Sequence, residues 1–442
     1  MIESDTLEKV LLDHLPKQRW FSGGTSLPAE IRVASARTLK EGWPALVHVV
    51  AEVPSSDGGV ARYQLVVGLR PREDMVFLEG RVDAFMGDVV TDDGPAHAYD
   101  AVFDQELAIH LLRLIAPGAD AERARVLQVE QSNTSVVYDE KLFLKLFRRL
   151  SDGGNPDIEV TTKLAEADFA GVAAPVGVWQ EDGLDLAVVN EFLAGASEGF
   201  SLALISLRDL YDRRCPPEEC GGDFAPEARR LGIVTAKLHL AMAAAFGTSD
   251  PDAGSWARDM VGQLERLGDI GVDTDAVRRV YERLADLGDA GRAVRIHGDY
   301  HLGQVMRTDT GWYVLDFEGE PDRPVEERRR PSSPLRDVAG MVRSFHYATE
   351  VVLRDRGEEE VDVELQALAR SWEERNGFAF REGYRAVKGI DDLLPADEAD
   401  GDLVLAAFEL DKALYEVGYE LGHRPDWVSI PRTAVDRLLE AL

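Results

Sequence analysis

Residues 295–306 read R-I-H-G-D-Y-H-L-G-Q-V-M, and residues 312–321 read W-Y-V-L-D-F-E-G-E-P. In the second stretch the apolar run Tyr313–Leu315 predicts a short strand that delivers Asp316 and Glu318 at its end. Side chains two residues apart on an extended chain point to the same side, so these carboxylates should lie close together. Two such carboxylates repel unless a cation or a hydrogen-bond network lies between them. Hard oxygen ligands of this kind suit Mg²⁺.

The first stretch places polar side chains in an apolar context, namely His297, Asp299, His301 and Gln304. Asp299 could accept a proton, and the amide oxygen of Gln304 could bind a metal. Acidic metal ligands follow about a dozen residues later. Phosphoryl transfer from ATP needs this combination of a base for the acceptor hydroxyl and a metal that bridges phosphate oxygens. The alternative interpretation is a hairpin stabilised by polar turn residues.

Charge and composition narrow the possible partners. The chain has 442 residues, with 49 Lys and Arg against 81 Asp and Glu, which gives a formal net charge of −32. This balance disfavours binding to nucleic acid and to anionic membrane surfaces. It permits a phosphate-bearing ligand that is held by a few local cations or a metal. No stretch reaches the roughly 18–20 apolar residues of a membrane helix.

The N-terminal residues and the cysteines bear on the expected location. The first residues are acidic and amphipathic and do not resemble a signal peptide. Cys215 and Cys220 lie in R-R-C-P-P-E-E-C-G-G-D, and no second Cys/His pair follows at zinc-site spacing. We therefore expect two reduced thiols in an exposed loop, a cytoplasmic location and a monomer.

A lysine in the β-rich half of the chain could complement the acidic cluster. Lys145 lies inside the apolar strand L-F-L-K-L-F, and lysine is seldom buried unless it is paired. Glu159, at the start of the next predicted helix, is the expected partner. A strand lysine held by a helix glutamate anchors nucleotide phosphates in protein kinases. The alternative is a surface lysine on an edge strand.

A polar turn precedes this strand. Its residues Ser132, Asn133, Thr134 and Ser135 could cover phosphates with backbone N–H groups and small side chains. The chain has no G-x-x-x-x-G-K-[ST] sequence, so a P-loop ATPase is not supported.

The pattern of hydrophobic residues changes near Gly195 from short strand-like runs to long helical periods. We expect three parts, a small antiparallel sheet with a leading helix over 1–100, a β-rich part over 101–195 and a helical part over 196–442. Helices in the last part are expected at 202–213, 225–246, 256–285, 334–355, 360–376 and 401–420.

An ordered set of motifs resembles the actinobacterial maltokinases and the related glucosamine kinases, within the aminoglycoside-phosphotransferase and protein-kinase-like superfamily. The motifs are P-K-Q-R-W-F, E-Q-S-N-T-S-V, K-L-F-R-R, G-N-P-D-I-E, H-G-D-Y-H-L-G-Q-V, D-F-E-G-E-P, S-P-L-R-D-V-A-G-M-V-R-S-F, D-K-A-L-Y-E-V-G-Y-E and H-R-P-D-W. They run from residue 16 to the C-terminal region, so the resemblance covers essentially the whole chain.

The resemblance implies an α+β, bilobal, protein-kinase-like fold with an N-terminal cap, ATP as co-substrate and Mg²⁺ as cofactor. It implies that Asp299 is the catalytic aspartate and that Gln304, Asp316 and Glu318 are metal ligands. It also makes Lys145 and Glu159 the phosphate-anchoring pair, and Val189, Asn190, Glu191 and Phe192 the hinge that receives adenine. Gln304 stands where many members of the superfamily carry Asn, so the metal position is expected to shift.

The acceptor is predicted from a helical face near the C-terminus. Glu409, Lys412, Glu416 and Glu420 recur at steps of three and four, among or just before Tyr415, Tyr419 and Trp427. Carboxylates and aromatic rings suit a sugar, and carboxylates also complement an ammonium group. Asp299 and His301 could reach the same ligand. The alternative is a solvated acidic helix.

These residues favour glucosamine as the acceptor, phosphorylated to glucosamine 6-phosphate. Gly418 and Gly422 fall where maltokinases commonly carry larger or basic residues, so the local charge becomes more negative. Maltokinase, which forms maltose 1-phosphate, stays the alternative. A catalytically weak protein that binds a sugar or nucleotide for regulation is the third hypothesis.

Overall fold

The structure is a computed structural model. It describes the chain apart from residues 1–3, 22–29, 55–58, 72–77, 79–80, 82, 128–132, 221, 321–322 and 357–361. Contacts divide the chain into two units. Unit 1 comprises Met1–Glu159 and Ala173–Ala194, and unit 2 comprises Val160–Val172 and Gly195–Leu442. The finer division of unit 1 near residue 100 stays a prediction.

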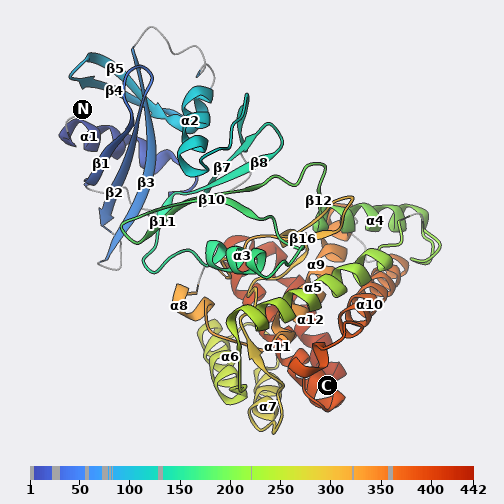
Figure 1. Ribbon diagram of the computed structural model, residues 1–442. Helices are drawn as coiled ribbons and strands as arrows, with labels where there is room; N and C mark the ends of the chain where they lie inside the picture. Colours follow the sequence, from blue (N-terminus) through green and yellow to red (C-terminus); the bar gives the residue numbers. More distant parts are fainter. Residues whose placement is uncertain are drawn as a thin grey trace. The chain divides into compact units, whose positions relative to one another are not determined.

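An antiparallel sheet forms the N-terminal part of unit 1 (Figure 1). Its strands are β1 (Arg32–Lys40), β2 (Ala45–Pro54), β3 (Val60–Pro71), β4 (Phe85–Thr91), β5 (Gly94–Asp100) and β9 (Arg149–Leu150). They follow the order β1-β2-β3-β5-β4, and β9 pairs with β3. The leading helix α1 (Ser4–His14) buries Leu7 and Leu11 in the same apolar cluster as Val49 and Leu65 of the sheet. The structure therefore has the small antiparallel sheet with a leading helix that the sequence predicts.

A second antiparallel sheet completes unit 1. Its strands are β6 (Ala124–Leu127), β7 (Asn133–Tyr138), β8 (Leu142–Phe147), β10 (Pro175–Glu181) and β11 (Leu184–Glu191), in the order β10-β11-β8-β7-β6. Asp139 and Glu140 join β7 to β8 with φ values of 51° and 55°, as a tight hairpin turn of the favoured twist requires. Helix α2 (Gln105–Ile115) buries Leu107 and Leu112 against this sheet. Strand β8 is central, so Lys145 does not lie on an edge strand.

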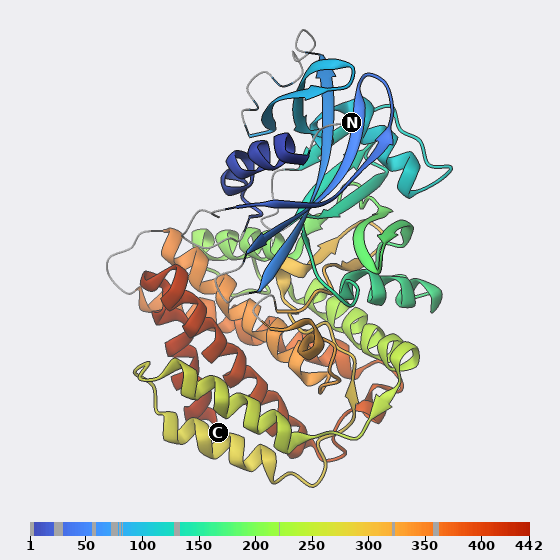
Figure 2. The same ribbon diagram turned by 90° about the vertical axis from the view of Figure 1, so that its left-hand side faces the viewer.

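Unit 2 is mostly helical (Figure 2). Its helices are α4 (Gly199–Arg213), α5 (Ala225–Phe246), α6 (Ala253–Leu267), α7 (Thr274–Ala285), α8 (Val325–Arg328), α9 (Leu335–Asp355), α10 (Val363–Arg385), α11 (Glu398–His423) and α12 (Ser429–Ala441). Helix α3 (Pro156–Glu166) begins in unit 1 and ends in unit 2. Strands β12 (Ser197–Glu198), β15 (Val305–Arg307) and β16 (Trp312–Val314) form one small sheet, and β13 (Thr248–Ser249) pairs with β14 (Ala293–Val294). None of the helices in the described chain has the length and apolar content to cross a membrane.

Helix α9 runs through the core of unit 2. Residues such as Val338, Met341 and Phe345 are fully buried. Helices α5 and α10 approach each other closely, since a Cβ at Gly232 would lie 2.0 Å from the carbonyl oxygen of Phe380. Only glycine permits this approach. The segments that carry the acidic motifs therefore rest on a tightly packed helical core.

The structure corrects the helix that the sequence predicts over 256–285. Helix α6 ends at Leu267 and α7 begins at Thr274. Gly268 and Gly271 between them have φ values of 66° and 73°. Glycine adopts this left-handed backbone without the steric cost of a Cβ, so it ends helices readily. The apolar periodicity continues on both sides of the break, which is why the sequence pattern does not reveal it.

The two cysteines form a disulfide, so the expectation of two reduced thiols is wrong. Cys215 and Cys220 follow α4, and their Cα atoms lie 6.0 Å apart, a separation that a disulfide spans. Cys220 is buried rather than exposed. Disulfides are rare in cytosolic proteins, so the cysteines no longer support the predicted location.

Candidate active site

The loop that carries Asp299 is fastened to the core by one buried carboxylate. Asp337, in the first turn of α9, accepts the backbone N–H groups of His297 and Gly298 at 2.8 and 2.9 Å. Its Oδ2 also lies 3.1 Å from Nε2 of His239 on α5. Burial alone would raise the pKa of Asp337, but these hydrogen bonds and the His239 ring hold it below its ordinary value. The sequence analysis quoted the motif around Asp337 without assigning this role.

We expect Asp337→Ala to destabilise unit 2 by about 3 kcal/mol or more. The substitution leaves two buried N–H groups without an acceptor, and each buried unsatisfied group costs about 1–3 kcal/mol. The midpoint of urea unfolding, followed by far-UV circular dichroism, measures the loss. Asp337→Asn is the matched control, because it keeps the shape and one acceptor oxygen and should cost less. Equal midpoints for wild type and Asp337→Ala would contradict the anchoring role.

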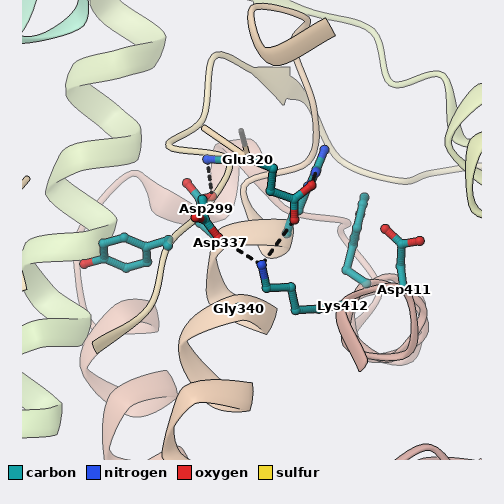
Figure 3. Close-up of a pocket in the computed structure, with 10 residues that line it drawn as sticks. Asp299, Glu320, Asp337, Gly340, Asp411 and Lys412 are labelled. Atoms are coloured by element: carbon teal, nitrogen blue, oxygen red, sulfur yellow. Dashed lines mark hydrogen bonds and ion pairs between the residues drawn. The ribbon is translucent and has the colours of Figure 1, made fainter. Parts of the chain in front are cut away.

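A lysine from the far end of the chain holds the predicted catalytic aspartate. Lys412 Nζ on α11 donates to Asp299 Oδ1 at 2.9 Å and to Glu320 Oε1 at 3.2 Å (Figure 3). Burial alone would raise the pKa of Asp299, but the Lys412 ammonium and the nearby rings of His301 and His297 keep it below its ordinary range. The half-buried carboxylate of Asp299 is therefore ionised.

The cavity beside Lys412 is very small. It is bordered by residues that include Asp299, Tyr300, Gly340 and Phe408, and its volume is about 10 Å³, the space of a single water molecule. On the side of this cavity, Asp299 Oδ1 therefore has no room for a ligand larger than a water molecule. Oδ2 lies 3.9 Å from His301 Nε2, which leaves it as the oxygen that can face an acceptor hydroxyl.

Glu320 is a site residue that the sequence analysis missed. Besides Lys412, it accepts hydrogen bonds from Arg323 at 2.6 Å and from Arg336 at 3.1 Å. Burial would raise the pKa of Glu320, but Lys412, Arg336 and Arg323 lower it overall. The available signal was its place in D-F-E-G-E-P, two residues after Glu318. Glu320 thus fixes the position of the Lys412 ammonium.

The three predicted metal ligands lie next to one another. Gln304 Nε2 donates to Asp316 Oδ2 at 3.2 Å, and carboxylate oxygens of Asp316 and Glu318 lie within 4.8 Å of each other. Asp316 has a φ of 62°, a backbone conformation that is uncommon outside glycine and often found at functional sites. His297 Nε2 bonds the carbonyl oxygen of Leu315 at 2.8 Å, which ties this turn to the Asp299 loop. An all-oxygen donor set with two carboxylates fits Mg²⁺.

In unit 1, Lys145 is buried and donates to Asp157 Oδ2 at 3.2 Å. The sequence analysis did not single out Asp157, which lies in the first turn of α3. Glu159, the expected partner, lies two residues further and is half-buried. The phosphate-anchoring role of Lys145 and Glu159 stays a prediction.

The structure describes three of the four residues of the predicted phosphate-covering turn. Ser132 lies outside the described residues, whereas Asn133, Thr134 and Ser135 begin β7. Thr134 Oγ1 accepts from the buried Arg148 at 2.7 Å, so this hydroxyl has a structural role.

Strand β11 carries the predicted hinge residues Val189, Asn190 and Glu191, and Phe192 follows it. The N–H of Glu191 bonds Ala174 O at 3.2 Å, and that of Phe192 bonds Lys141 O at 2.8 Å. These two N–H groups are therefore engaged within unit 1. The adenine-binding role of the segment stays a prediction.

The charged side chains on the acidic face of α11 have different partners. Lys412 bonds Asp299, whereas Glu416 accepts from Arg343 of α9 at 2.6 Å. Glu420 accepts from Tyr347 at 2.7 Å and is buried. Glu409 borders a separate cavity that does not include Asp299 or Lys412. Each of these side chains therefore packs against a different part of the helical core, and their shared role in binding the acceptor stays a prediction.

The other predicted acceptor residues have structural contacts as well. His301 Nδ1 accepts the N–H of Gly303 at 3.0 Å. The Tyr415 ring centroid lies 4.7 Å from Lys412 Nζ. Trp427 stacks on Tyr347 at 6.2 Å between ring centroids. Their acceptor-binding roles stay predictions.

Packing offers a second explanation for one of the glycines that favoured glucosamine. A Cβ at Gly418 would lie 2.7 Å from Leu267 Cδ2 of α6. A larger residue would force Leu267 to shift. The absence of a side chain at Gly418 therefore need not concern the acceptor.

Comparisons with known proteins identify relatives of this chain. Residues 14–104 match the maltokinase N-terminal cap domain, and residues 222–389 match the phosphotransferase enzyme family. The glucosamine kinase of Streptacidiphilus jiangxiensis is 28% identical over 350 residues, which cover 75% of this chain and 77% of that protein. The glucosamine kinase of Mycolicibacterium smegmatis is 28% identical over 338 residues, which cover 72% of this chain and 80% of that protein.

A solved structure of a glucosamine kinase in complex with glucosamine, ADP and inorganic phosphate has the same fold. It superposes with a TM-score of 0.69 at 23% identity, covering 99% of this chain and 100% of that one. The α+β, protein-kinase-like fold class and the resemblance drawn from the motifs are confirmed. The chain is a phosphotransferase with a maltokinase-type cap and is similar to glucosamine kinases over most of its length.

Proposed function

We propose that this phosphotransferase transfers the terminal phosphoryl group of ATP to glucosamine and forms glucosamine 6-phosphate. The observation that carries the chemistry is the half-buried, ionised Asp299 on the same anchored loop as Gln304, which contacts Asp316 beside Glu318. The acceptor is supported by the two relatives, which are glucosamine kinases, and by the related kinase solved with glucosamine.

Asp299 would orient the attacking hydroxyl and take its proton. Lys412 occupies Oδ1 and leaves Oδ2 toward the acceptor. A carboxylate with a lowered pKa is a weak base, but phosphoryl transfer passes through a loose transition state that depends chiefly on positioning and charge stabilisation. Asp299 therefore contributes both by holding the hydroxyl in line and by taking its proton during the transfer.

Gln304, Asp316 and Glu318 would hold magnesium. When bound, magnesium would supply positive charge that offsets the negative charge developing on the transferred phosphoryl group. The protein contributes a turn that presents three oxygen-bearing side chains together. His297 keeps this turn in register with the Asp299 loop through its bond to Leu315.

In unit 1, we propose that Lys145 and Glu159 anchor the phosphates of ATP and that residues 189–192 receive adenine. Lys145 is buried and paired, as a phosphate-anchoring lysine would be before ATP binds. Asn133, Thr134 and Ser135 would line the phosphates with Ser132. Because ATP is the donor, a cytoplasmic location stays part of the proposal, together with a monomeric state.

Maltokinase is the second candidate, because residues 14–104 match the maltokinase cap. A maltokinase would phosphorylate a disaccharide at its first carbon. The catalytically weak regulator is disfavoured, since the described structure brings Gln304, Asp316 and Glu318 together and keeps Asp299 ionised.

We expect glucosamine to exceed glucose as a substrate by about 10–150-fold in kcat/KM. A hydrogen bond to a charged group contributes roughly 1.5–3 kcal/mol, and glucose lacks the ammonium group. His301, Lys412, Tyr415, Glu416 and Trp427 are the residues proposed to contact the acceptor. The preference should shrink as the pH rises past the pKa of the amine, because the ligand then loses its charge.

Release of ADP with a panel of sugars measures this preference, and NMR of the product identifies the phosphorylated carbon. Efficient phosphorylation of maltose with little turnover of glucosamine would establish the maltokinase alternative. Equal rates with glucose and glucosamine would discard charge recognition and leave the kinase assignment in place.

A further inference from the structure

A second cavity, partly open to solvent, is bordered by α9, α10, α11 and α12 of unit 2. Its volume is about 190 Å³, which exceeds the roughly 150 Å³ of an engineered protein cavity that holds benzene. Its polar border includes Arg343, His346, Glu373, Glu409 and Arg437. The cavity therefore has room for a six-membered ring and charged groups to bind it.

This cavity is separate from the pocket at Asp299. On α9, the centre of the residues that border it lies about 140° around the helix axis from the centre of Asp337 and Gly340, which border the Asp299 pocket. On α11, Glu409 is likewise rotated by about a third of a turn from Asp411 and Lys412. The two cavities thus open on different sides of both helices.

Most charges around the cavity are already neutralised. Arg343 pairs with Glu416 at 2.6 Å. Arg437 Nη1 lies 3.2 Å from Glu373, and His346 Nδ1 lies 3.0 Å from the same carboxylate. Arg343, Arg437, His346 and Glu373 therefore each already lie beside a group of opposite charge.

Glu409 is the exception among the charged groups that border the cavity. The described chain supplies it with no hydrogen bond or ion pair, although Arg343 and Arg381 act on it electrostatically from a distance. Burial raises the pKa of Glu409 to about 7, more than these two arginines lower it. An ionised Glu409 thus needs a further cation close by.

Two buried nitrogen atoms of the border also have no partner within the described residues. They are Arg343 Nε and His346 Nε2, on side chains that are 4% and 2% exposed. Buried polar groups are nearly always hydrogen-bonded, and exceptions call for an explanation such as a bound molecule.

We propose that this cavity binds a small hydroxylated amine of amino-sugar size, whose ammonium group pairs with Glu409. Its hydroxyl groups would bond polar side chains of the border, and its carbon face would pack on Val342, Ala434 and Leu438. An anionic ligand is disfavoured, because Glu409 would repel it and both arginines are already paired. The site would sense an amine without taking part in phosphoryl transfer.

Equilibrium dialysis of the full chain with radiolabelled glucosamine, without ATP, tests the proposal. Ala434→Phe fills the cavity from α12 and should remove one equivalent of bound glucosamine, while ATP-dependent turnover stays unchanged. Glu409→Gln keeps the size of the side chain and removes its charge, so the affinity of this equivalent should fall by about 10–150-fold. Asp436→Asn, at an exposed position of α12, is the matched control and should leave both equivalents intact.

These experiments test ligand binding in the cavity even if glucosamine is not the acceptor of the proposed reaction. If the acceptor is another sugar, wild type binds one equivalent instead of two, and Ala434→Phe still removes it. Identical binding by wild type, Ala434→Phe and Glu409→Gln would overturn the proposal. So would glucose binding at the cavity as tightly as glucosamine, or loss of turnover in a folded Ala434→Phe protein, which would make this cavity the acceptor site.

Discussion

Replacing Asp299 with Asn is expected to lower kcat by about 10²–10⁴-fold, the usual contribution of a general acid or base. The amide has nearly the same size, but it cannot take the proton of the acceptor hydroxyl. It also loses the charge that Lys412 neutralises at 2.9 Å. The affinity for ATP should stay nearly unchanged, because Asp299 is assigned to the acceptor. Steady-state ADP release and fluorescence titration with a nucleotide analogue measure the two quantities.

Asp309→Asn is the matched control for Asp299→Asn, because Asp309 is exposed in the turn between β15 and β16. It removes the same charge from a position close in sequence and should keep full activity. Near wild-type turnover in Asp299→Asn would remove Asp299 from its catalytic role. A parallel loss of nucleotide affinity would instead assign it to the donor.

Asp316→Ala is expected to reduce activity by about 10³-fold or more. A bound metal supplies several kcal/mol of transition-state stabilisation, and each 1.36 kcal/mol is a factor of ten in rate. Asp316 is the anionic ligand that contacts Gln304, so its removal should weaken magnesium binding strongly. Activity measured across a titration of Mg²⁺ should show a raised requirement and only partial rescue.

Gln304→Ala serves as the comparison for Asp316→Ala. It deletes a neutral ligand that water can replace, so a smaller loss and fuller rescue by Mg²⁺ are expected. If Gln304→Ala proves far more damaging than Asp316→Ala, the ranking of the two ligands is wrong. If the activity of neither variant depends on the Mg²⁺ concentration, this turn does not bind the metal.

The sequence by itself determined the features that depend on near neighbours in the chain. The strand before Asp316 and the lysine inside an apolar strand both follow from local periodicity. The carboxylates of Asp316 and Glu318 lie close together as predicted, but on a turn that begins with a φ of 62° at Asp316 and not on an extended strand. Ordered motifs established the superfamily and hence the α+β fold. Local interactions and motif order are written directly in the sequence, so this level of prediction was reliable.

Only the tertiary structure decided which distant groups meet. Lys412 reaches Asp299 across 113 positions, and Asp337 anchors a loop that lies about 40 positions earlier. The acidic face of α11 is split among three environments because α9 packs along it, with Arg343 pairing with Glu416 and Tyr347 bonding Glu420. Helical periodicity predicts which side chains share a face. It cannot predict which of them meet a charge on another helix, because that depends on how the helices pack.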